Sequence, residues 1–136
     1  MSRIRLRRMN SQVEGKVYPP VRVRLAAERV RAFAEAVGAQ EGEVPPTFAT
    51  AAEFASFPAV VTDPELGLDF TRVVHGEQEY EWRRGLVEGE TLDATSRVAS
   101  IREKGGHGFL TIETELRGAD GEIAVIARAT MIERGA

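Results

Sequence analysis

The sequence offers few side chains for metal-based or covalent catalysis. It contains no cysteine, and its two histidines, His75 and His107, lie far apart in the chain. A catalytic zinc or non-haem iron site needs three or four convergent ligands, and neither histidine has a second ligand at motif spacing. The serines lie outside any GxSxG context, and the glycines form neither a dinucleotide-binding nor a P-loop pattern. We therefore expect no metal and no cofactor.

General acid–base chemistry remains open at His75. Gly76 and three polar residues (77–79) follow it at the expected beginning of a strand. An imidazole with a pKa near neutrality beside carboxylates could move a proton. The more frequent alternative is a histidine hydrogen-bonded to backbone, with Gly76 allowing close packing. His107 lies among glycines (residues 105–108), and we expect an exposed turn residue there.

Composition and charge narrow the class of protein. With 136 residues, 43% hydrophobic and 29% charged, the chain has the size and composition of one globular domain. The net charge is −3, although the first eight residues hold four arginines and no acid. An acidic body without a basic stripe argues against nucleic-acid binding. No apolar run has the length of a membrane span, and the absence of cysteine fits a cytoplasmic protein.

The first half of the chain predicts a strand and a helix. Alternating apolar residues at 21–25 predict a half-buried strand. Val30, Phe33, Ala34 and Val37 form one apolar stripe, which predicts an amphipathic helix over 26–37 ending at Gly38. Residues 48–61 are rich in Ala and Phe. We expect a short helix running into an extended piece there, although periodicity does not place the boundary.

The second half predicts four strands, at residues 72–84, 90–104, 109–117 and 123–132, each with alternating apolar positions. Asp120 and Gly121 are typical of a two-residue hairpin. Helices placed early and strands joined by short links predict an α+β fold with an antiparallel sheet of about five strands.

Several motifs carry a family resemblance. VVHGEQEYEW at residues 73–82, followed by RGLVEGETL at 84–92, resembles the N-terminal half of MaoC-like hydroxyacyl-thioester dehydratases. VYPP at residues 17–20, AFAEAVG at 32–38, PPTF at 45–48 and REK at 102–104 agree in order with that resemblance. It implies a hot-dog fold, a sheet wrapped around a helix, over residues 15–136. Residues 1–14 are expected to form a flexible basic tail.

The resemblance also implies what the chain does not do. Catalytic halves of that family carry an Asp and a His in the loop after the first helix, whereas residues 38–45 here read GAQEGEVP. The implied role is a non-catalytic subunit that binds acyl-CoA or acyl-carrier-protein thioesters beside a catalytic MaoC-type partner or in a homodimer. No catalytic residue is expected. The residues expected to contact substrate are Pro46, Thr47, Phe48, Phe54, His75 and Gly76, although core packing is the more frequent role for the phenylalanines.

Two other functions stay open. A homodimeric hot-dog acyl-thioester hydrolase could recruit Glu41, Glu43 or Glu53 to position water. A non-enzymatic acyl-CoA-binding module would need no catalytic group.

Overall fold

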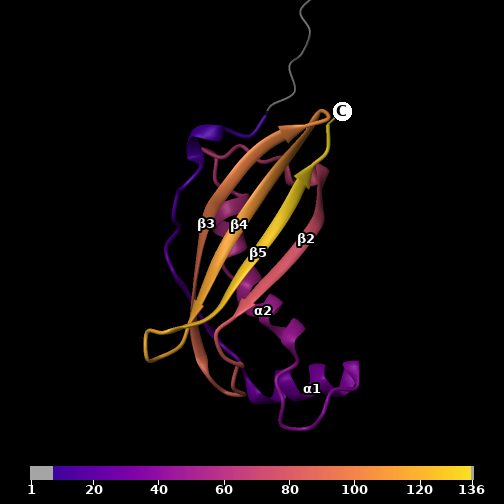
Figure 1. The fold of residues 1–136 in the computed structure, drawn as a ribbon, viewed down its shortest axis with the longest axis vertical. Helices are drawn as coiled ribbons and strands as arrows, with labels where there is room; N and C mark the ends of the chain where they lie inside the picture. The colour runs from indigo at the N-terminus through magenta and orange to yellow at the C-terminus, as the bar shows by residue number, and fades with distance from the viewer. Residues whose placement is uncertain (1–7, 136) are drawn as a thin grey trace, which may run out of the picture.

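The computed structural model describes residues 8–135, which form one antiparallel sheet with helices against one face and at one end (Figure 1). The strands are β1 (Val21–Arg24), β2 (Val73–Trp82), β3 (Thr91–Lys104), β4 (His107–Arg117) and β5 (Ile123–Glu133). Their order in the sheet is β1-β3-β4-β5-β2. The predicted α+β class and five-stranded antiparallel sheet are confirmed, and β1 and β2 form the two edges.

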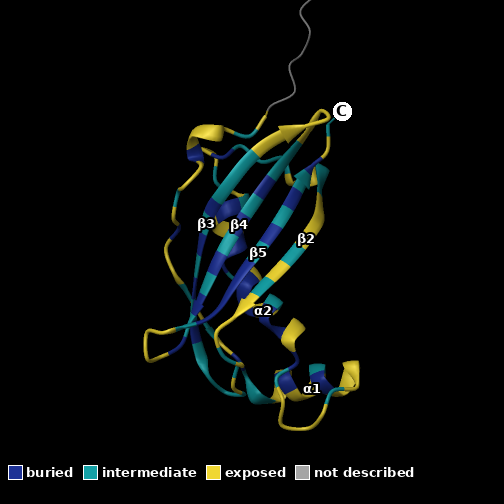
Figure 2. Ribbon diagram, in the orientation of Figure 1, coloured by how far each residue is buried: buried dark blue, intermediate teal, exposed yellow. Residues whose placement is uncertain are grey.

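The long strands alternate as predicted. Leu92, Ala94 and Val98 on β3 have no exposed surface, and neither do Leu110 and Ile112 on β4. Their outward neighbours are partly exposed, so the sheet has one buried face and one polar face (Figure 2). The period of two in the sequence was sufficient to assign these faces.

The first predicted helix is α1 (Ala27–Val37), which ends at Gly38 with a left-handed φ of 72°. It lies beyond one end of the sheet, whereas α2 (Ala49–Phe54) and α3 (Phe57–Val61) run against the buried face (Figure 1). The extended piece expected before Val61 is wrong, because the chain there is helical. Pro58 falls in the first turn of α3, where its missing N–H is no disadvantage.

Three short 3-10 helices complete the chain: η1 (Ser11–Val13), η2 (Pro46–Phe48) and η3 (Phe70–Arg72). Residues 1–7 of the expected basic tail lie outside the described residues. The remainder of that segment packs on the domain, because Val13 is only 6% exposed and Met9 contacts the core. The packed domain therefore begins before residue 15.

Two turns differ in detail from their predictions. Gly105 and Gly106, both with positive φ, make the tight turn between β3 and β4, so His107 is the first residue of β4. The loop at 118–122 is longer than the two-residue hairpin that Asp120 and Gly121 suggested. The register between β4 and β5 shifts at Leu116/Arg117, next to this loop. Such a bulge places an extra residue in one strand, so the connecting loop need not be a two-residue turn.

The interior consists of two apolar clusters with a layer of buried polar residues between them. One apolar cluster surrounds α3 and includes Phe57, Val60 and Leu66, and a second surrounds η2 and α1 and includes Val30 and Phe48. Buried polar residues occupy the positions between the two clusters along the helices and strands: Glu53, Ser56, Ser96 and Thr114. We call these four residues the polar belt. None of the helices within residues 8–135 has the length and apolar character needed to cross a membrane.

Candidate functional site

The centre of the polar belt is Glu53, on the buried side of α2. The whole Glu53 residue is buried and has no exposed surface. The Gln78 side chain on β2 reaches it from the edge of the sheet, and its Nε2 donates to both carboxyl oxygens at 3.0 Å. Helix α2 and strand β2 together therefore place one carboxyl group in the interior with an amide as its neighbour.

Burial changes the acidity of this group. Loss of solvent raises the pKa of Glu53 from an ordinary 4.5 to about 7, while hydrogen bonds from Gln78 and Tyr80 oppose the increase. No cation within residues 8–135 contributes to this balance, and a buried carboxyl group without one favours its neutral form. A carboxyl group that titrates near neutrality is suited to donate or accept a proton.

Other polar contacts join the same helix and strand. The hydroxyl groups of Thr50 and Tyr80 are hydrogen-bonded to each other, and burial raises the pKa of Tyr80. The Gln78 Oε1 atom is buried and has no hydrogen-bond partner within the described part of the chain. Because an unpaired buried acceptor is costly, this amide is the least satisfied group of the site.

The belt continues from α2 across the sheet. The Ser56 hydroxyl donates to the Glu53 carbonyl oxygen at 2.8 Å and is hydrogen-bonded to Ser96 on β3. Ser96 lies 2.7 Å from the Thr114 hydroxyl on β4. These hydroxyl groups satisfy one another, which allows polar atoms to remain in a fully buried layer.

An aromatic pair lies beside Glu53 at the same edge. Phe54 is 38% exposed, and its ring centroid is 5.9 Å from that of His75 on β2. The His75 Nε2 lies 3.1 Å from the Glu77 carbonyl oxygen. Gly76 occupies a bulge where a Cβ atom would be 2.5 Å from Ile132 Cδ1, so only glycine fits without movement of that side chain.

The other expected substrate contacts lie elsewhere. Pro46 and Thr47 are exposed in η2, and Phe48 is buried with its ring 5.4 Å from that of Phe33. The structure therefore brings Phe54, His75 and Gly76 together at the β2 edge, whereas Phe48 packs in the core near α1. A substrate-binding role for all six residues stays a prediction.

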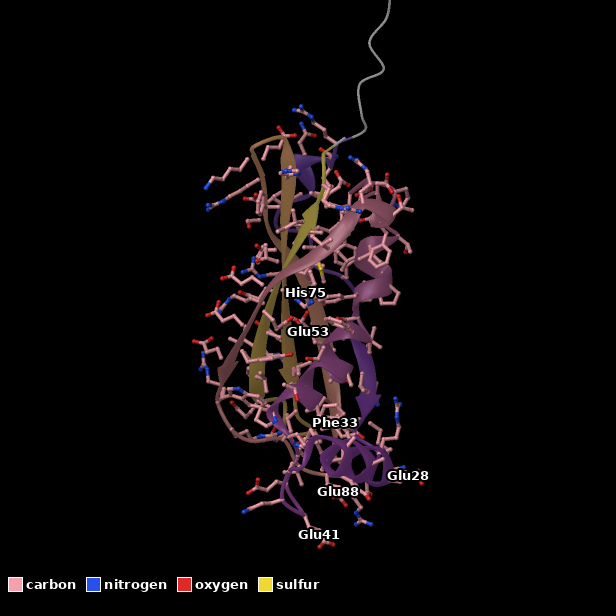
Figure 3. The ribbon with its side chains drawn as sticks, turned by 90° about the vertical axis from the view of Figure 1, so that its right-hand side faces the viewer. Glu28, Phe33, Glu41, Glu53, His75 and Glu88 are labelled. Carbon is pink, nitrogen blue, oxygen red and sulfur yellow. The ribbon has the colours of Figure 1, made fainter. Side chains whose placement is uncertain are left out.

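The carboxylates of the loop after α1 form a separate surface. An open hollow there is lined by Arg31, Glu35, Glu41, Glu43 and Glu88, among others, and Arg31 pairs with Glu88 at 2.7 Å. Figure 3 shows Glu41 and Glu88 at the α1 end, far from Glu53 and His75. Within residues 8–135, no group of three or more His, Asp or Glu side chains could hold a metal ion.

Sequence reasoning named Glu53 only as one of three carboxylates and missed Gln78 as a site residue. A signal was present in both cases. Glu53 is the single acid in an Ala- and Phe-rich segment, and Gln78 occupies an inward position of an alternating strand. What the sequence did not show is that these two positions face each other across α2 and β2.

Comparisons with known proteins agree with this architecture. A family model described as "FAS1-like, dehydratase domain region" matches residues 37–127. A UPF0336 protein of Saccharopolyspora erythraea is 34% identical over 138 residues, which covers 89% of this chain and 88% of the relative.

Two solved structures show the fold. A chain from the HadBC (3R-hydroxyacyl-ACP dehydratase) complex of Mycobacterium tuberculosis has a TM-score of 0.70 at 19% identity, covering 88% of this chain and 96% of that chain. A MaoC-like dehydratase has a TM-score of 0.79 at 21% identity, covering 91% of this chain but 43% of that chain. The expected hot-dog fold is confirmed. The chain belongs to the FAS1-like dehydratase-region family, together with the UPF0336 proteins, and has the hot-dog fold of the MaoC-like dehydratases.

Proposed function

We propose that this chain is a non-catalytic subunit of an (R)-specific 3-hydroxyacyl-thioester dehydratase or enoyl hydratase. The observation that carries the proposal is the loop after α1, which presents Glu41 and Glu43 to an open hollow without an imidazole. His75 lies on β2 and His107 begins β4, so neither supplies the missing group at that loop. The chain would complete a double hot dog with a catalytic MaoC-type partner.

The edge strand β2 supports such pairing. It is hydrogen-bonded to β5 on one side only, and its free edge can extend into the sheet of another subunit. The matched HadBC structure is by its description a dehydratase complex, which supports a two-chain arrangement here. In this arrangement Phe54 and His75 would border the junction, where an acyl-CoA or acyl-carrier-protein thioester would be shared between the subunits in the cytoplasm.

The direct test is co-expression with a candidate catalytic MaoC-type chain, followed by measurement of crotonyl-CoA hydration. We expect the mixture to exceed the catalytic chain alone, and equal rates would reject the subunit role. Phe54→Ala should weaken the stimulation, whereas Phe70→Ala, which removes another exposed ring (61% exposed), should not.

A second candidate is a homodimeric acyl-thioester hydrolase, favoured specifically by the buried Glu53. A carboxyl group that ionises near neutrality could position and deprotonate water if the interface between α2 and β2 opens. The purified chain would then hydrolyse acyl-CoA, and Glu53→Gln would abolish that activity. Absence of hydrolysis across acyl lengths would exclude this candidate, and thioester binding without turnover with any partner would indicate a binding module.

A further inference from the structure

The outer face of the sheet carries an alternating line of charges. Arg97 on β3 donates to Glu113 on β4 at 2.9 Å, and Arg128 on β5 donates to the other oxygen of Glu113 at 2.9 Å. Arg128 in turn lies 3.5 Å from Glu79 and 3.6 Å from Glu81, both on β2. The order across four neighbouring strands is therefore basic, acidic, basic, acidic.

The alternating line of charges ends with carboxylates on β2, the strand at the free edge of the sheet. Glu79 and Glu81 share a single Arg128 and have side chains 65% and 45% exposed. Arg83 adds only a distant contact to Glu81, at 3.9 Å. Glu77, opposite Thr130 in the register, has no ion pair within residues 8–135. A strand that continues the sheet past β2 would find uncompensated negative charge opposite its own outer face.

A second copy of this chain fits that edge poorly. Two β2 strands paired antiparallel about a two-fold axis centred on Glu79 would bring Glu79 opposite Glu79 of the second copy, with Glu77 opposite Glu81 on both sides. Moving the register by two residues still leaves acidic side chains opposite one another. Like charges in directly opposed positions destabilise strand pairing, whereas opposite charges stabilise it.

We propose that β2 selects an unlike partner, a hot-dog chain whose edge strand carries Lys or Arg on its outer face. The inference rests on the proposed pairing of subunits along β2. It adds that charge on the outer face disfavours the homodimer, and that the partner is recognised by the basic side chains that continue the alternation.

The test uses this chain alone. A variant with Glu77→Lys, Glu79→Lys and Glu81→Lys supplies the complementary edge, and native mass spectrometry follows dimers in the wild type, the variant and their mixture. We expect the mixture to dimerise about tenfold more tightly than either protein alone, because three repulsive pairs are replaced by three attractive pairs and a tenfold change needs only about 1.4 kcal/mol in total. A control variant with Glu28→Lys, Glu35→Lys and Glu41→Lys makes the same charge change away from the edge and should not dimerise with the wild type.

Salt provides a measurement that does not depend on the folding of the variant. If carboxylates oppose self-pairing, raising NaCl from about 50 to about 500 mM should increase self-association of the wild type, because salt screens exposed charges. A wild-type homodimer that is as tight as the mixture and insensitive to salt would overturn the proposal. Failure of a catalytic partner to stimulate hydration, with the charge-paired mixture still forming, would instead reject the proposed function and leave the edge selectivity standing.

Discussion

Replacing Glu53 by glutamine should stabilise the protein at neutral and alkaline pH. The folded protein holds the proton of Glu53 up to a pKa of about 7, whereas an unfolded chain releases it near 4.5. The contribution of the neutral carboxyl group is therefore fully present below pH 4.5 and is lost as the pH rises to 7. The difference between the pKa of Glu53 in the folded protein and its pKa in the unfolded chain corresponds to about 3 kcal/mol of unfolding free energy.

The glutamine side chain of the Glu53→Gln variant is neutral at every pH and has nearly the shape of the protonated acid, so the variant avoids this loss. We expect the difference between Glu53→Gln and the wild type to be near zero at pH 4.5 and to approach about 3 kcal/mol at pH 8.

Urea denaturation at both pH values measures this difference. The carboxyl groups with a lowered pKa, such as Asp63, which is held down mainly by its hydrogen bond from Lys16, are present in both proteins and cancel in the comparison. Glu43→Gln alters an exposed loop carboxylate and should change stability by less than about 0.5 kcal/mol at either pH. A stabilisation of Glu53→Gln that is equal at pH 4.5 and pH 8 would refute the assignment of a buried, proton-holding carboxyl group.

Two further substitutions test the surroundings of the site. Gly76→Ala should destabilise the protein by about 0.5–1.5 kcal/mol in thermal or urea unfolding, because the new Cβ meets Cδ1 and Cγ1 of Ile132 and the end of that side chain must turn away; in an Ile132→Ala background, which lacks both atoms, the same substitution should cost little, and an undiminished cost would mean that the bulge itself is at fault. Ser96→Ala should cost about 1–3 kcal/mol because Ser56 and Thr114 lose a shared partner, whereas Thr95→Ala, outward on the same strand, should leave the urea midpoint nearly unchanged.

The strands could be predicted from the sequence because their faces differ in polarity. On β3, Leu92, Ala94 and Val98 alternate with polar residues, and one buried face is enough to fix that alternation. The α1 helix could likewise be predicted because its apolar residues lie on one face. Its position at the end of the sheet could not, because the contact between Phe33 and Phe48 joins segments that no local pattern connects.

The segment 48–61 shows why the site was harder to predict. Its alanines and phenylalanines are compatible with a buried helix or a buried strand, and periodicity does not separate these alternatives. Glu53 within it would ordinarily be assigned to a solvent-exposed turn of a helix. Its buried carboxyl group finds its polar contacts in Gln78 and Tyr80, and both of these residues lie on β2, far along the chain.

Strand β2 takes part in two hypotheses, the buried carboxyl site at Glu53 and the charge-selected pairing with another chain. They can be tested separately because successive side chains of β2 point to opposite faces of the sheet. Gln78 and Tyr80 face inward to Glu53 and Thr50, whereas Glu77, Glu79 and Glu81 are exposed. Substitution of the outer carboxylates should therefore change pairing with another chain while the pH dependence of unfolding is kept. Substitution of Glu53 should change that pH dependence while charge-driven pairing is kept. If either set of variants altered both properties, the edge strand would have moved as a whole, and the assignment of separate roles to its two faces would fail.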